Sequence, residues 1–271
     1  MAPSNSTTKA LLKQFIPSAF YPVLRRAYKQ VYYFGLTYTC PFCKSHLKTF
    51  LPFGEDLPVL YERNVVGGGH RDHALCPICK STDRDRLLYL YLLKKTEIFK
   101  KPLRVLHVAP ESSLECILRR ESHLDYLTTD LFKTNVMVKT DITNMNFPDH
   151  CFDAIICNHV LEHIVDDRKA MSELYRILKP GGWAILQVPI SMSSPSTYED
   201  VSITTEEARK TAFGQSDHVR IYGQDYQDRL TKAGFSVNIF CWIDAPAHFG
   251  GQRNAYSLNT AERIYHVSKP R

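Results

Sequence analysis

The stretch from Phe152 to Ile190 constrains the fold most, because its periodicity changes twice. Phe152 to Cys157 is an apolar run with the length of one buried strand. Asp166 to Leu178 then places apolar residues at helical spacing, and a Lys-Pro-Gly-Gly sequence ends that helix before a second apolar run begins at Trp183. A strand, a crossover helix and a second strand predict one βαβ unit of a parallel sheet. Its ligand site should lie beyond the carboxyl ends of the strands.

The two motifs of this stretch, FDAIICNHVLEHI and RILKPGGWAILQVP, follow each other at the spacing of one βαβ unit. In this combination the chain resembles the class I S-adenosylmethionine-dependent methyltransferases, specifically the type 11 group. The resemblance covers Lys101 to Lys269, the usual size of an α/β domain. It implies an α/β fold with a Rossmann-like, seven-stranded, mostly parallel doubly wound sheet, and S-adenosyl-L-methionine as cofactor. The alternative is a doubly wound domain of another function, because a fold alone does not fix function.

Composition indicates a globular protein of one or two domains, since 271 residues with 44% hydrophobic content suffice for a packed core. No uncharged apolar run approaches the length of a membrane-spanning helix, and the N-terminus lacks the features of a signal peptide. We therefore expect a cytoplasmic location. The net charge of +6 allows an anionic partner such as nucleic acid without requiring one.

We expect three parts: a basic amphipathic helical segment over residues 1–38, a small zinc-ribbon-like domain with a linking helix over 39–100, and a methyltransferase domain over 101–271. The first part combines basic and apolar residues and contains no acidic residue. Its residues 9–34 either contact a membrane surface peripherally or hold a lipid-like substrate. Alternatively, they form a helix packed on its own domain. The sequence predicts no oligomeric state.

Two CxxC pairs, Cys40 with Cys43 and Cys76 with Cys79, predict a metal site. In a reducing compartment such pairs more often hold a metal than form a disulfide. Four thiolates on two tight turns supply the ligands of tetrahedral Zn²⁺ and leave no open position, so we expect the zinc to be structural.

The first strand is followed by a turn that departs from the family pattern. Ala109, Glu111 and Ser113 stand where glycines are expected, and His107 replaces the common acidic residue. Ser112 and Glu115 have capping-box spacing, which predicts a helix start able to bind the carboxylate of the donor. Glu111 either pairs with the ammonium group of the donor or only stabilises the positive end of the helix dipole.

Other donor contacts are expected at the ends of the next strands. The second strand, Leu124 to Thr128, ends near Asp130, where a carboxylate can accept both hydrogen bonds of a ribose diol. The alternative role of Asp130 is to cap the next turn. By resemblance, Asp141 accepts from the adenine amine, Ile142 packs on the ring, and the backbone at Asn158 lies near the sulfonium. The expected cofactor-binding residues are His107, Ala109, Glu111, Asp130, Asp141, Ile142, Asn158 and His159.

A polar segment from Phe213 to Gly223 is expected beside the active site. Asp217 should orient His218, because an imidazole with a pKa near neutrality is suited to remove a proton from an acceptor. Arg220 is expected to hold an acid or phosphate group. The alternative is a lid without a chemical role. The expected catalytic residues are His218, His159 and Asp217, and the expected substrate-binding residues are Arg220, Tyr222 and Tyr198.

The spacing of His159, Glu162 and His163 also fits metal ligands, but two histidines without a third ligand are usually only neighbours. We therefore expect no catalytic metal there. The predicted reaction is methyl transfer to a small molecule or to a peptide or saccharide product, at oxygen. One alternative is a zinc-ribbon RNA methyltransferase, since a basic ribbon can hold phosphates. The other is a non-catalytic zinc-bearing scaffold with a degenerate donor pocket. The sequence does not name the acceptor.

Overall fold

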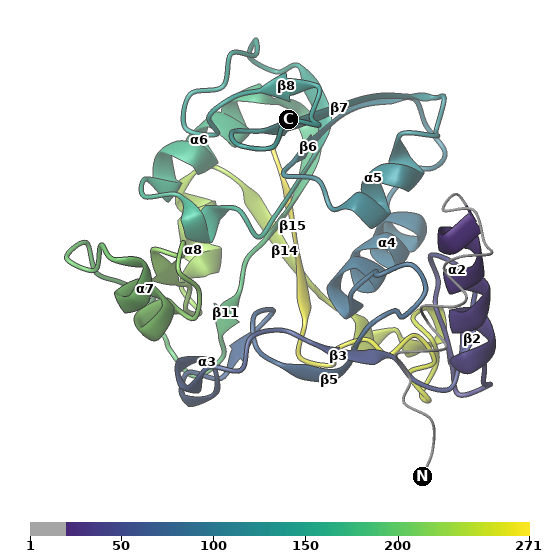
Figure 1. The fold of residues 1–271 in the computed structure, drawn as a ribbon. Helices are drawn as coiled ribbons and strands as arrows, with labels where there is room; N and C mark the ends of the chain where they lie inside the picture. Colours follow the sequence, from purple (N-terminus) through teal and green to yellow (C-terminus); the bar gives the residue numbers. More distant parts are fainter. Residues whose placement is uncertain (1–19) are drawn as a thin grey trace.

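The computed structural model describes residues 20–271, and its centre is a seven-stranded sheet (Figure 1). The strands lie in the order β14 (Ser236–Cys241), β15 (Arg263–Ser268), β10 (Leu178–Gln187), β9 (Phe152–Asn158), β6 (Leu103–Val108), β7 (Leu124–Asp130) and β8 (Val138–Lys139). Strands β6 to β10 are parallel to one another, and β15 is antiparallel to both of its neighbours. The predicted mostly parallel, doubly wound fold is confirmed.

The order of the strands fixes where a ligand can bind. The chain enters the interior of the sheet with β6, adds β7 and β8 on one side, and then crosses to the other side with β9 and β10. The connections that leave β6 and β9 therefore diverge, which opens a crevice beyond the carboxyl ends of these neighbouring strands. The site expected from this topology lies next to Val108 and Asn158.

Helices cover both faces of the sheet, as the alternating side chains of its strands require. Ile155 and Leu186 pack in a cluster with α6 (Asp167–Ile177) and α8 (Tyr226–Lys232) on one face. Ile156 and Ile185 point the opposite way, toward α4 (Asp83–Lys95) and α5 (Ser112–Leu118). Because successive strand residues alternate between faces, both faces of the central strands are apolar.

The βαβ unit comprises β9, α6 and β10, with one difference from the expected boundaries. Strand β10 begins at Leu178, directly after the helix, and its pairing with β9 shifts between Leu178 and Trp183. Gly181 takes a left-handed φ of 80° inside this irregularity. A Cβ on Gly182 would lie 2.9 Å from the carbonyl oxygen of Asp153. The two glycines therefore form a bulge within the strand.

The N-terminal part of the described chain is built from short elements. These are α2 (Tyr21–Tyr32), β1 (Tyr38–Thr39), β2 (His46–Leu47), β3 (Leu51–Phe53), α3 (Pro58–Glu62), β4 (Val65–Val66) and β5 (Arg71–Leu75). Strand β4 pairs with β11 (Ile190–Ser191), which follows β10 of the central sheet in sequence. The fully buried guanidinium of Arg86 donates hydrogen bonds to carbonyls of both parts, namely those of Ala74, Ser81, Tyr256 and Ser257. The N-terminal part is thus held firmly against the sheet.

The segment between β10 and α8 forms a layer beyond the carboxyl ends of the strands. It contains β12 (Tyr198–Glu199), which pairs with β13 (Arg220–Ile221), and α7 (Glu206–Phe213). Short 3₁₀ turns complete the described chain: η2 (Leu161–His163), η3 (Trp242–Asp244) and η4 (Pro246–His248).

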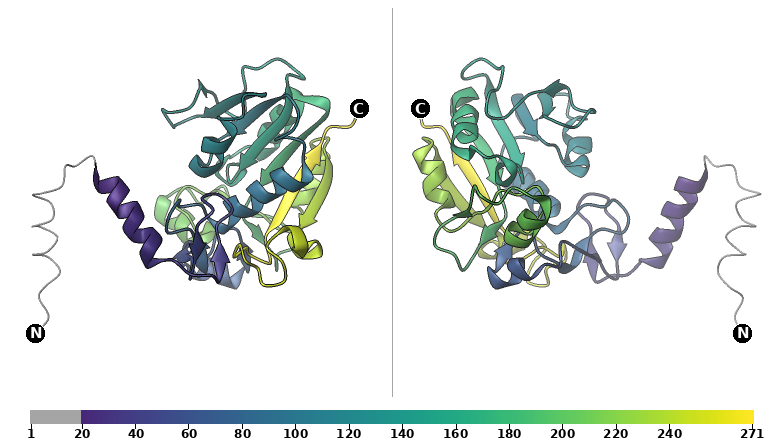
Figure 2. Two further views of the ribbon diagram at one scale, coloured as in Figure 1. Left: turned by 90° about the vertical axis from the view of Figure 1, so that its right-hand side faces the viewer. Right: turned by 60° about the vertical axis from the view of Figure 1, so that its left-hand side comes forward.

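Helix α2 buries none of its side chains and projects from the protein (Figure 2). Its apolar residues are open to solvent, with Val31 80% and Tyr28 66% exposed. One expectation was that this helix packs on its own domain, and for α2 that expectation is wrong. Residues 1–19 of the predicted amphipathic segment lie outside the described residues, and membrane contact stays a prediction. No helix among residues 20–271 has the length and apolar character needed to cross a bilayer.

Candidate active site

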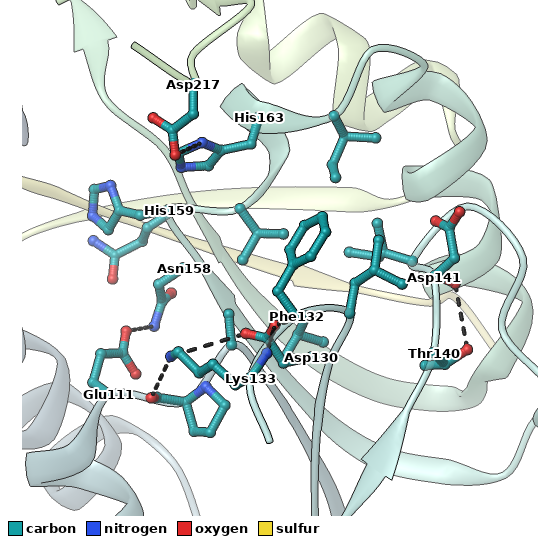
Figure 3. Close-up of a pocket in the computed structure, with 18 of the residues that line it drawn as sticks. Glu111, Asp130, Phe132, Lys133, Thr140, Asp141, Asn158, His159, His163 and Asp217 are labelled. Atoms are coloured by element: carbon teal, nitrogen blue, oxygen red, sulfur yellow. Dashed lines mark hydrogen bonds and ion pairs between the residues drawn. The ribbon is translucent and has the colours of Figure 1, made fainter. Parts of the chain in front are cut away.

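A cavity of about 770 Å³ lies beyond the carboxyl ends of β6, β7, β8 and β9 (Figure 3). Its volume is within the range of cofactor sites, about 300–1,000 Å³. It is lined by seven of the eight residues predicted to bind the cofactor: Ala109, Glu111, Asp130, Asp141, Ile142, Asn158 and His159. The strand ends bring together residues that are far apart in the sequence, as the topology required.

Ala109 supplies the backbone shape for which the family uses glycine. It takes a left-handed φ of 48°, and its N–H donates to the carbonyl of Thr129 across the neighbouring strand end. The capping box predicted at Ser112 is wrong, because Ser112 is already the first residue of α5 and Glu111 is the N-cap without a side-chain cap. The left-handed φ of Ala109, a residue with a Cβ, is kept at a cost in backbone strain.

Glu111 is held by hydrogen bonds at both carboxylate oxygens. Oε2 lies 2.7 Å from Nε2 of His107, and Oε1 accepts from Nδ2 of Asn158 at 3.0 Å. Burial acts to raise the pKa of Glu111, but the hydrogen bonds and charge of its partners outweigh burial and hold the pKa below its usual value. A negative charge therefore faces the cavity at neutral pH.

The prediction that His107 contacts the cofactor is wrong. Its side chain is fully buried and is not part of the cavity wall. The Nδ1 atom lies 2.8 Å from the hydroxyl of Tyr126, and Nε2 faces Glu111. His107 acts behind the wall by orienting the Glu111 carboxylate.

Asp130 and Asp141 each use one carboxylate oxygen to fix the loop that follows its strand. Oδ1 of Asp130 accepts from the N–H groups of Phe132 and Lys133, which is the turn-capping role. Oδ1 of Asp141 accepts from the N–H and hydroxyl of Thr143. Among residues 20–271, Oδ2 of Asp141 makes no hydrogen bond, and Oδ2 of Asp130 makes only an ion pair of 3.9 Å with Nζ of Lys133. Both side chains keep an acceptor for a ligand.

A second cavity, of about 520 Å³, lies between the N-terminal part and the sheet domain. Residues 52–55 and 67–68 form one wall, and Pro189, Gln215 and His218 belong to the opposite side. Arg84, His159 and His163 line both cavities. The two spaces therefore meet at these three side chains.

His159 occupies this junction in a constrained conformation. It has a left-handed φ of 53°, and its N–H donates to the carbonyl of Gln187. Its ring lies 2.9 Å from Nη1 of Arg84, and its Nδ1 lies 3.4 Å from Oε1 of Glu162. Burial first, and then the charge of Arg84, lowers the pKa of His159 well below its usual value. The ring is therefore neutral at pH 7.

The sequence suggested that Asp217 orients His218, but the structure pairs Asp217 with another residue. Its Oδ2 lies 3.2 Å from Nδ1 of His163, and these two side chains point toward each other (Figure 3). His218 is 5% exposed and packs edge-to-face on His163. Burial lowers the pKa of His218 to about 4, so it is neutral but a weaker base than expected.

The substrate-binding roles predicted for Arg220 and Tyr222 are wrong, because both side chains are buried and paired within the protein. The Arg220 guanidinium donates to the carbonyls of Leu161, Ile164 and Val165 and to the carboxylate of Glu199. The Tyr222 hydroxyl donates to Asp167. They fix the turn that carries Glu162 and His163. Tyr198 stacks on the Arg63 guanidinium and lines neither cavity.

The sequence did not reveal that the carboxyl group of Glu162 is buried and has a raised pKa. Its side chain is 1% exposed, its Oε2 has no hydrogen-bond partner within residues 20–271, and burial raises its pKa to about 8. A glutamate next to His163 in the mostly apolar run Val160–Ile164 was the available signal, since a buried carboxyl group is rare without a functional or structural reason.

The four predicted cysteine ligands converge at the N-terminal part. Their sulfur atoms lie within 4.8 Å of one another, with Cys40 and Cys79 3.5 Å apart and Cys43 and Cys76 3.8 Å apart. The turns at the two CxxC pairs have the same conformation. Lys44 and Lys80 both take a left-handed φ, and the backbone N–H of each donates to the carbonyl of the first cysteine of its pair.

Comparison with known protein families identifies a similarity in the central part of the chain. A family model described as a methyltransferase domain matches residues 114–186, which run from α5 to β10 and include Asp130, Asp141 and Asn158. Residues 114–186 are therefore similar to a methyltransferase domain. With the strand order around it, the matched domain has the fold of the class I S-adenosylmethionine-dependent methyltransferases.

Relatives of the methyltransferase domain match only part of the chain. A demethylmenaquinone methyltransferase of Clavibacter sepedonicus is 41% identical over 49 residues, which are 18% of this chain and 20% of that protein. The uncharacterized protein YafE of Escherichia coli is 29% identical over 130 residues, 46% of this chain and 60% of that protein. The chain thus spans less than two thirds of the length of these relatives.

Solved structures give weaker similarity. An S-adenosylmethionine-dependent methyltransferase from Mesorhizobium loti has a TM-score of 0.45 at 15% identity, covering 69% of this chain and 97% of that one. A putative methyltransferase from Bacillus halodurans has a TM-score of 0.42 at 18% identity, covering 68% and 99%.

Proposed function

We propose that this protein transfers a methyl group from S-adenosylmethionine to an acceptor bound in the adjoining cavity. The observation that carries the proposal is the meeting of the two cavities at His159. Methyl transfer is an in-line displacement that depends mainly on holding donor and acceptor at near-attack distance. Two spaces that share a wall supply that arrangement. When bound, the donor supplies an electrophilic methyl group on its sulfonium.

The residues of the larger cavity fit the donor. The ionised Glu111 faces the space and suits an ammonium group. Oδ2 of Asp130, which makes only a 3.9 Å ion pair with Lys133, can accept from a ribose diol. Asp141 has a free oxygen for the exocyclic amine of adenine, and Ile142 provides an apolar surface for the ring. Within this proposal, residues 101–271 form the methyltransferase domain and 39–100 the zinc-ribbon-like domain with its linking helix.

For the acceptor, we propose an oxygen atom of a small molecule or of a peptide or saccharide product. The space for it is a bounded cavity of about 520 Å³, which suits a small group better than a long polymer. Its wall carries Arg71 and Arg84 together with Glu55 and Glu162, so a polar acceptor is favoured. The alternative acceptor is RNA, for which the net charge of +6 provides general attraction.

We also propose that the four cysteines bind a structural Zn²⁺. In a tetrahedral site with Zn–S bonds of about 2.3 Å, sulfur atoms lie roughly 3.8 Å apart. The distances of 3.5 and 3.8 Å therefore fit. Ser81 adds a hydroxyl 3.2 Å from the sulfur of Cys79, which suits a hydrogen bond to a thiolate.

The test is transfer of an isotope-labelled methyl group. Purified protein and the labelled donor are incubated together with one acceptor fraction at a time. The fractions are a metabolite extract, a peptide and saccharide fraction, and total RNA. Label in a small-molecule, peptide or saccharide product supports the proposal, and Asp130→Ala should reduce it. Label confined to RNA would favour the RNA methyltransferase instead. No transfer to any fraction, together with no donor binding, would indicate the scaffold.

A further inference from the structure

Three side chains that the donor site does not use face one another at the second cavity. They are Glu162 and His163, on η2, and His218, in the loop before β13. One ligand atom from each lies within 4.8 Å of the other two. Two imidazoles and a carboxylate are thereby brought together from positions about fifty residues apart in the sequence.

The free oxygen of Glu162 is unusual for a folded protein. Its side chain is 1% exposed, and no donor among residues 20–271 reaches Oε2. Burial of a carboxyl group without a hydrogen-bond partner is costly, so such groups are normally paired or bound to a metal. A bound cation beside Oε2 removes this cost.

The surroundings of the histidines have the form of a metal site. Oδ2 of Asp217 lies 3.2 Å from Nδ1 of His163, which leaves Nε2 of that ring free. A ligating histidine usually donates its second ring N–H to a carboxylate or carbonyl in this way, because the contact fixes the tautomer and the ring orientation.

Buried contacts hold the cluster in place. The N–H of Val219 donates to the carbonyl of Glu162 and so ties the His218 loop to η2. The guanidinium of Arg220 donates to the carbonyls of Leu161 and Ile164 on either side of the two ligands. A preorganised site of this kind loses little conformational freedom when an ion binds.

We propose that Glu162, His163 and His218 bind a divalent transition-metal ion at the floor of the second cavity. This ligand set is that of catalytic zinc sites with an open fourth position. All three ligands line the second cavity, so the open position faces the space assigned to the acceptor.

The role of the metal, unlike its binding, rests on the proposed methyl transfer. An acceptor hydroxyl at the open position becomes more acidic and releases its proton to solvent. Its oxygen then forms the O–CH₃ bond while the C–S bond breaks, and that electron pair returns to sulfur. The donor leaves as a neutral thioether.

The experiment counts zinc per chain in the full-length protein. Wild type, Glu162→Gln, His218→Ala and Cys40→Ser are equilibrated with Zn²⁺, desalted and measured by atomic emission. We expect about two ions per wild-type chain, and about one in each of the three variants. His70→Ala, which alters a histidine outside both metal clusters, should keep about two.

Glu162→Gln is nearly isosteric and decides the result if His218→Ala does not fold. Asp217→Asn should keep the ion but weaken its binding about 10- to 100-fold, measured by competition with a chelator. One zinc ion in the wild type, or two in Glu162→Gln, would overturn the proposal. The count does not depend on turnover, so its failure is distinct from failure of methyl transfer.

Discussion

The carboxylate of Glu111 lies 2.7 Å from the imidazole of His107, with the carboxylate at the donor cavity and the imidazole fully buried behind it. The pair explains how a chain without the usual glycines keeps a cation-binding surface at this turn. His107 and Asn158 together keep Glu111 ionised despite its burial. The cavity therefore presents a negative charge, which suits the positively charged groups of the proposed donor.

Glu111→Gln should weaken binding of S-adenosylmethionine by about 1–3 kcal/mol, because a buried charge-assisted hydrogen bond is lost. Calorimetry with the donor and with S-adenosylhomocysteine measures the change. Both ligands share the ammonium group, so an equal loss places Glu111 at that group. A loss confined to the sulfonium compound places it at the reacting end, and unchanged affinity for both contradicts any contact.

Ala109 should tolerate glycine but not a β-branched residue. Its φ of 48° is readily adopted by glycine, whereas valine suffers steric conflict there. Ala109→Val should lower the free energy of unfolding by about 1–3 kcal/mol, and Ala109→Gly should change it by less than about 1 kcal/mol. Denaturant titration measures both. Equal stability of the two variants would show that the turn does not require the left-handed conformation.

The sequence predicted the sheet and much of the cavity wall, because strand periodicity and strand ends are local features. Asp130 and Asp141 could be placed in advance, since each lies at or just beyond the end of a strand. His107 could not, because whether a strand residue faces the cavity or the layer behind it depends on packing against Tyr126. The same argument applies to the exposed apolar side of α2, which shows an amphipathic pattern without indicating what covers it.

Loss of zinc from the cysteine site should unfold the N-terminal part. Cys40→Ser removes one of four thiolates, and the cluster around it has few other buried apolar residues, chiefly Leu47 and Phe50. We expect a lower melting temperature for the variant, and the same effect when a strong chelator is added to the wild type. Thermal denaturation with and without chelator measures this. A melting temperature unaffected by both would contradict a structural metal.

Glu262 should make stability depend on pH. Burial raises its pKa from 4.5 to about 7, so it stays protonated in the folded protein over a range where the unfolded chain is ionised. Its stabilising contribution is therefore complete below pH 4.5 and is lost as the pH rises to about 7, by roughly 3 kcal/mol in total.

Glu262→Gln tests this directly, since glutamine does not titrate. The variant should be more stable than the wild type at pH 8, and the difference should shrink toward pH 5. Denaturant titrations at a series of pH values measure it. If the free energy of unfolding changed with pH in the same way in both proteins, Glu262 would not have a raised pKa.

The polar segment after α7 shows most clearly what sequence alone could not determine. Spacing placed Asp217 beside His218, but the fold turns Asp217 toward His163, from a distant element. Arg220 looked like a ligand-binding residue because it is charged. The structure buries it against backbone carbonyls, where it supports η2. Charge and adjacency in sequence do not reveal which side chains a tertiary contact pairs.

The central claim is that the cavity of about 770 Å³ holds the methyl donor. The most direct measurement is calorimetric titration of the full-length protein with S-adenosylhomocysteine, compared with Asp130→Ala. We predict saturable one-to-one binding to the wild type, weakened in the variant by about 1–3 kcal/mol through loss of the ribose hydrogen bonds. No heat of binding to the wild type, or equal affinity of the two proteins, would contradict this assignment.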